Sequence, residues 1–239
     1  MDQSGPTTRL SDAVRDLAAQ VVSALRSGGH SPVGGAFPPS TGDDEITVAA
    51  VRVLGADTLL PDALSFRPAD PAAVALVARA VRAFPPGASP APTTAWSHWA
   101  MAGALRRLAP GSAEPGGSGE PGGATAEPDT AWLEYAPWPV LTHQLAVLAA
   151  LAVPGCDSGI ARVAAARPVD VARGFVRAVR RRDWLQAAGA GRWLTLLDGV
   201  PDTLGLGTGL EFVGLMGGTD PRVVLHLRAA GLLRTGVPV

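Results

Sequence analysis

The sequence contains no lysine, so each of its 20 basic residues is an arginine. Without lysine the chain cannot use a Schiff-base lysine, a phosphate-loop lysine or a Ser–Lys catalytic pair. Its single cysteine, Cys156, excludes an intrachain disulfide and a zinc site built from several cysteines. Charged residues make up only 17% of the 239 residues, and the net charge is −1. This balance argues against a strongly basic protein that binds nucleic acid or membrane surfaces through its overall charge.

Long apolar runs are also missing. The longest nearly uncharged stretch, 138–154, is shorter than the roughly 20 residues that a membrane span needs. Residues 1–8 are polar and lack the apolar core of a secretion signal. We therefore expect a cytoplasmic protein without membrane contact, in which 138–153 forms a buried central helix.

Helix start and stop signals recur along the chain. Asp70-Pro71 and Asp220-Pro221 each place a capping carboxylate and a first-turn proline before an apolar periodic segment. Ser11 and Asp183 are predicted to cap two further helices. Convincing alternating strands and Asn-Gly hairpins are missing. The sequence thus predicts an all-α protein, a bundle of about nine helices interrupted by a flexible Gly/Pro-rich insertion.

The insertion is predicted at 109–130, where 10 of 22 residues are Gly or Pro and none is Val, Ile, Leu, Met or aromatic. Such a segment has no large apolar side chain to offset the entropy of ordering, so we expect a disordered linker. It separates an N-terminal helical part, 9–108, from a C-terminal helical part, 131–239. We expect the two parts to pack together as one core.

The strongest local signal is positive charge. Residues 160–193 carry eight arginines against two aspartates. Arg173, Arg177 and Arg180 recur at helical spacing and share one face, and Arg181 follows them. This stripe is a candidate surface for a protein partner or an anion, and the simplest alternative is a solvated helix face near a helix C-terminus. Residues 160–182 also have a weak helix-turn-helix pattern without the usual turn glycine, which keeps a DNA-binding regulator as an alternative.

A second candidate is a pocket formed by Trp132, Glu134, Trp138 and His143, in which Glu134 would orient His143 or share a proton with it. For His143 a core position is the simpler interpretation. The four histidines are far apart in sequence and fit no zinc motif, so we expect no metal site. For Cys156 a structural thiol is favoured over a nucleophile, because no hydrolase signature surrounds it.

These observations predict a non-catalytic helical interaction or accessory protein that works with another protein. We expect no catalytic residues and no cofactor, and another protein is a more natural partner than nucleic acid. The alternatives are the DNA-binding regulator, which would use 160–182, and a small-molecule-binding protein or enzyme with a Trp/Glu/His-lined pocket.

Overall fold

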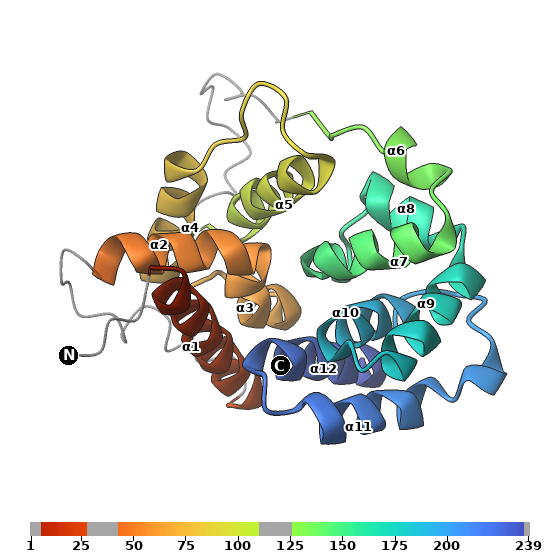
Figure 1. The fold of residues 1–239 in the computed structure, drawn as a ribbon. Coiled ribbons are helices and arrows are strands. Elements are labelled where there is room, and N and C mark those ends of the chain that lie inside the picture. The colour runs from red at the N-terminus through yellow and green to blue at the C-terminus, as the bar shows by residue number, and fades with distance from the viewer. Residues whose placement is uncertain (1–5, 28–42, 110–125, 237–239) are drawn as a thin grey trace. The chain divides into compact units, whose positions relative to one another are not determined.

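The computed structural model describes residues 6–27, 43–109 and 126–236. All regular elements within these residues are helices, as Figure 1 shows, so the predicted all-α bundle is confirmed. The chain divides into two compact units, 1–128 and 129–239. Most of the expected linker at 109–130 lies outside the described residues, and a core shared by the two parts stays a prediction.

The first unit is a small bundle in which several helices have a proline in their first turn and α4 has a side-chain cap. Asp70 accepts a hydrogen bond from the Ala72 N–H at 2.7 Å, as its predicted capping role requires. The prediction that Ser11 caps the first helix is wrong. That helix begins at Pro6, because proline is compatible with the first turn of a helix. The helices are α1 (Pro6–Arg26), α2 (Asp43–Leu54), α3 (Leu60–Ser65), α4 (Pro71–Ala83) and α5 (Pro92–Leu108), with a 3₁₀ turn, η2 (Gly55–Leu59).

Aromatic packing fills the core of the first unit. Trp96 is fully buried, and its ring meets the edge of Trp99 at a centroid distance of 5.3 Å. Leu17 and Val21 of α1 and Val77 of α4 are buried as well. Trp96 is therefore part of the hydrophobic core, and the half-buried Trp99 packs against it.

The second unit is built around one central helix, α10, which packs against α7, α9, α11 and α12. Small residues allow these close approaches: a Cβ at Gly189 would lie 2.9 Å from the Ala146 carbonyl oxygen of α7. Trp193 of α10 is buried, and its indole N–H donates to the Leu145 carbonyl at 2.7 Å. The helices of this unit are α6 (Ala131–Glu134), α7 (Trp138–Val147), α8 (Gly159–Ala165), α9 (Pro168–Arg180), α10 (Trp184–Leu194), α11 (Leu206–Gly217) and α12 (Pro221–Thr235), with 3₁₀ turns η3 (Ala149–Leu151) and η4 (Asp202–Leu204).

The apolar run at 138–153 differs from its prediction as one helix. The α-helix ends at Val147 and is followed by the 3₁₀ turn η3, and Pro154 then disfavours helical backbone at Val153. Its Leu141 and Leu145 are fully buried, whereas Val147 is 57% exposed. Among the described residues, no helix combines the length and apolar character needed to cross a membrane.

Candidate functional site

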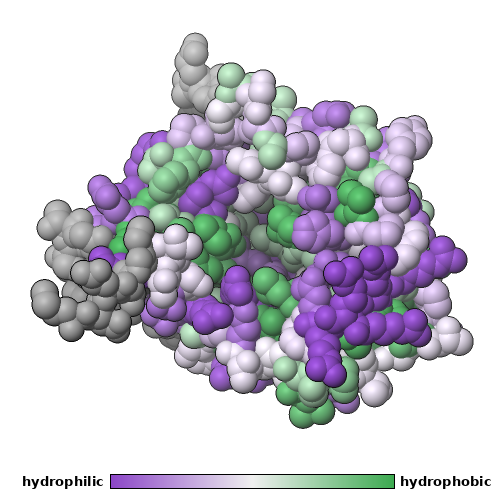
Figure 2. Space-filling model, in the orientation of Figure 1, coloured by the Kyte–Doolittle hydropathy of each residue, from purple (hydrophilic) through white to green (hydrophobic). Residues whose placement is uncertain are grey.

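The candidate site is built on α9, whose two faces differ sharply. Pro168 opens the helix and Asp170 lies in its first turn, both of which favour a helix N-terminus. Val171 and Phe175 are buried against the unit's core, whereas the arginines project outward. Figure 2 shows the strongly hydrophilic side chains gathered over α9. The predicted arginine stripe is therefore presented at the surface of an ordered helix.

Arg167, just before α9, fixes this helix against the chain segment that leads into α7. Its guanidinium donates to the carbonyl oxygens of Glu134 at 3.1 Å and Ala136 at 2.7 Å. It also pairs with Asp170 at 2.7 Å. These bonds are charge-assisted, and those to Ala136 and Asp170 are partly buried, so they help to hold Trp138, at the start of α7, beside α9.

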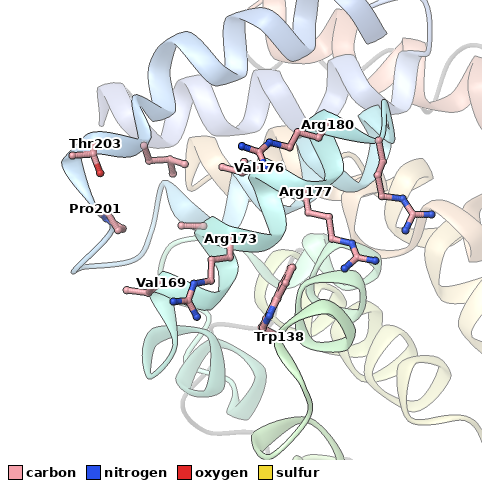
Figure 3. Close-up of a pocket in the computed structure, with 11 residues that line it drawn as sticks. Trp138, Val169, Arg173, Val176, Arg177, Arg180, Pro201 and Thr203 are labelled. Carbon is pink, nitrogen blue, oxygen red and sulfur yellow. The ribbon is translucent and has the colours of Figure 1, made fainter.

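A groove of about 710 Å³ runs along the exposed face of α9. Figure 3 shows that Trp138 borders it on one side, while Pro201 and Thr203 belong to the segment on the other. Valines of α9 form the apolar part of the lining, and arginines form the charged part. The lining residues are Trp138, Val169, Ala172, Arg173, Val176, Arg177, Arg180, Arg181, Pro201, Thr203 and Leu204.

The arginines of this groove are largely uncompensated. Arg173 has a weak ion pair with Asp170 at 3.5 Å. Within the described residues, no carboxylate forms an ion pair with Arg177, Arg180 or Arg181. Instead, the Arg177 guanidinium carbon lies 5.5 Å from the centre of the Trp138 ring, a cation–π arrangement. The groove thus combines net positive charge with apolar surface.

Behind Trp138 and Arg177 lies a smaller hollow of about 290 Å³, which also shares Arg181 with the groove. His143 and Gln186 line it, and the His143 Nδ1 and the Gln186 Oε1 are 3.2 Å apart. Asp183 lines it too, but its carboxylate already accepts a hydrogen bond from the Gln186 N–H and caps α10. The hollow is therefore more nearly neutral than the groove.

The structure brings some of the predicted site residues together and separates others. All four predicted arginines, at 173, 177, 180 and 181, line the groove. Trp138 and His143 both line the hollow. His143 is exposed at the surface, so the prediction of a core position is wrong.

Trp132 and Glu134 do not join the other pocket candidates. The Trp132 indole donates to the Asp129 carbonyl, and Glu134 accepts from the Thr130 hydroxyl at 2.6 Å. These local bonds hold both side chains on α6, and neither lines the groove or the hollow. The four-residue convergence that would favour a small-molecule or catalytic pocket is not formed.

The sequence did not predict that the segment 201–204 would form one wall of the groove. This wall belongs to the turn η4, about 20 residues after α9, and no periodic signal links this segment to the arginine stripe. The next helix, α11, begins at Leu206, after Gly205 has adopted a left-handed conformation with φ of 58°. Short connections of this kind carry too little pattern to be placed in space from sequence.

The described residues contain no cluster of three or more His, Cys, Asp or Glu side chains arranged to hold a metal ion. The groove has the chemistry of a binding site. Its guanidinium groups can bind carboxylates or phosphates, and its apolar lining, here called the apolar floor, can contact hydrocarbon groups. Comparison of the chain with protein-family models, with curated proteins and with solved structures finds no match.

Proposed function

We propose that this protein is a non-catalytic interaction module that binds an acidic, partly apolar segment of another protein in the α9 groove. One observation carries the proposal. Arg177, Arg180 and Arg181 line a single groove that also has an apolar floor, and no described carboxylate neutralises them. An acidic segment with apolar side chains satisfies both kinds of surface.

The shape of the groove favours a protein segment over duplex DNA. A recognition helix must protrude to enter the major groove, which is about 12 Å wide. The arginine face of α9 instead lies between Trp138 and the 201–204 segment, and Val169 and Val176 share the lining. The near balance of charge in this unit also favours a protein segment over duplex DNA, because 129–239 contains 11 arginines and 9 carboxylates.

The expected binding is moderate and sensitive to salt. Each exposed arginine–carboxylate pair contributes about 0.2–1 kcal/mol, and the apolar lining contributes roughly 25 cal/mol per Å² of surface removed from water. Salt weakens the first contribution and leaves the second largely intact. We also propose that this interaction takes place in the cytoplasm, as the sequence predicts.

The test measures binding of a fluorescent synthetic peptide rich in Glu and Leu to the full chain. Fluorescence anisotropy of the peptide gives the Kd. The variant Arg173→Ala/Arg177→Ala/Arg180→Ala removes three groove charges. Its matched control, Arg106→Ala/Arg107→Ala/Arg228→Ala, removes three exposed arginines outside the groove. We expect the groove variant to raise Kd by about tenfold or more, as three lost ion pairs predict, and the control to change it by less than about twofold.

Equal losses in the two triple variants would contradict the proposal, because they would reflect net charge alone. Binding of duplex DNA, measured in parallel, tests the alternative function of a DNA-binding regulator. Duplex binding that is tighter than peptide binding, with a log–log salt slope reduced by about one for each arginine removed, would overturn the proposal in favour of a DNA-binding regulator. Thermal melts of both variants check that each remains folded.

A further inference from the structure

We infer that the segment bound in the groove is an amphipathic α-helix that lies antiparallel to α9, with its acidic residues in its N-terminal half. This inference rests on the proposed function and specifies the conformation and direction of the bound segment. It is carried by three features of the groove: its all-helical surroundings, the positions of its arginines along α9, and its apolar floor.

The first feature concerns backbone hydrogen bonds. An extended peptide gains affinity mainly by pairing its main chain with the edge of a sheet. The described part of 129–239 contains helices and connecting segments but no strand, so the groove offers no such edge. A bound extended chain would lose water from its N–H and C=O groups without replacing those hydrogen bonds. A helix satisfies its own backbone, so a helix can enter this groove at lower cost.

The second feature sets the direction. Arg180 and Arg181 lie at the C-terminal end of α9, and Arg173 lies near its middle. Carboxylates that face Arg180 and Arg181 fall in the first turns of an antiparallel helix, where the partner's own helix dipole favours negative charge. In a parallel helix they would fall in the last turns, where the dipole disfavours them. The macrodipoles of adjacent antiparallel helices also attract each other.

The third feature gives the sequence pattern of the partner. Arg180, Arg177 and Arg173 are separated by three and then four residues, which correspond to rises of about 4.5 and 6 Å along a helix. Acidic residues at i, i+3 and i+7 of an antiparallel helix match these steps. A leucine at i+4 lies on the same stripe and faces the apolar lining formed by Val176 and Leu204.

The experiment compares synthetic peptides of about 18 residues, long enough to form a helix on binding. The matched peptide carries Glu at i, i+3 and i+7 in its first half and Leu at i+4, with Ala and Gln elsewhere. A second peptide has the same composition with the Glu residues moved to the opposite face. A third places Pro in the middle of the matched sequence, and a fourth has the matched sequence reversed. Anisotropy with the full-length protein gives each Kd.

We expect the matched peptide to bind about tenfold more tightly than the other three. A double-mutant cycle then checks direction. Removing the first Glu and Arg180 together should cost no more than either single change, each of which weakens binding roughly two- to fivefold. The first Glu and Arg173 should instead behave additively.

Equal affinities for all four peptides would overturn the helical inference and leave the proposed function standing, since charge and apolar content would then suffice. Tighter binding of the proline peptide would overturn it in favour of an extended segment. Coupling of the first Glu to Arg173 instead of Arg180 would overturn the antiparallel direction. Failure of every acidic peptide to bind would overturn the inference together with the proposed function.

Discussion

A buried carboxyl group in the first unit provides a stability test that is independent of partners. Asp62 of α3 is only 5% exposed, and its Oδ2 accepts no hydrogen bond within the described residues. Burial, with a further contribution from the negative charge of Asp70, raises the pKa of Asp62 from 3.8 to about 6. The folded chain therefore binds a proton at Asp62 more tightly than the unfolded chain does.

The sign of the effect on stability follows from this difference. The contribution of Asp62 is fully present below pH 3.8 and is lost as the pH rises through 6, since only the folded state must then hold a buried charge. A pKa of about 6 against 3.8 corresponds to roughly 3 kcal/mol lost at pH 8. Of this, about 1.4 kcal/mol is lost between pH 5 and pH 8.

The substitution Asp62→Asn removes the charge and keeps the shape of the side chain. We expect the variant to be more stable than the wild type by about 1–2 kcal/mol at pH 8. The gain is smaller than the full effect of removing the charge, because the buried amide has unsatisfied hydrogen-bonding groups of its own. Urea unfolding followed by far-UV circular dichroism measures the difference at pH 5 and at pH 8. A gain of this size shifts the midpoint by roughly 0.5–1 M urea.

The decisive quantity is the change in that difference with pH. Asp16→Asn on α1 is the control: Asp16 is exposed, and we expect its substitution to have the same small effect at both pH values. A variant at position 62 that is less stable than the wild type at pH 8, or a gain that does not grow between pH 5 and pH 8, would refute the reasoning.

Two core substitutions test the second unit. Gly174→Ala should destabilise it by about 2 kcal/mol or more, because the added methyl would overlap the buried Thr142 side chain, and a loss below about 0.5 kcal/mol would show that α7 and α9 can separate. Leu145→Ala should cost about 2–5 kcal/mol, since Leu145 is fully buried, whereas Val147→Ala, at a position 57% exposed, should cost under about 1 kcal/mol. Urea unfolding measures both, and similar costs at 145 and 147 would refute the burial pattern of α7.

Local signals in the sequence predicted local structure well. Asp70, Asp183 and Asp220 all accept the capping hydrogen bonds that their positions indicated. The arginine stripe was predictable for the same reason, because helical spacing alone places Arg173, Arg177 and Arg180 on one face. Each of these predictions depends on residues within two turns of one another.

The candidate site required information that a periodic pattern does not carry. Arg167 helps to hold Trp138 beside Arg177 by bonding to backbone carbonyls of the 134–136 segment. Every residue has such a carbonyl, so the sequence does not show which ones accept these bonds. The wall at Leu204 comes from a short turn whose place depends on the packing of α10 and α11. Tertiary contacts of this kind convert a charged helix face into a groove.

The central position of α10 affects the order in which the groove and the core beneath it are completed during synthesis. Every residue that lines the groove precedes position 205, so the chain has synthesised the whole groove lining before α12 exists. Yet α10, which packs against α7 and α9, also packs against α12, so the core around α10 is complete only when α12 is present. A nascent chain that ends before Pro221 therefore contains all the groove residues but an incomplete core. Under the proposed function, binding would begin only after α12, which contributes no residue to the groove, has been synthesised and packed.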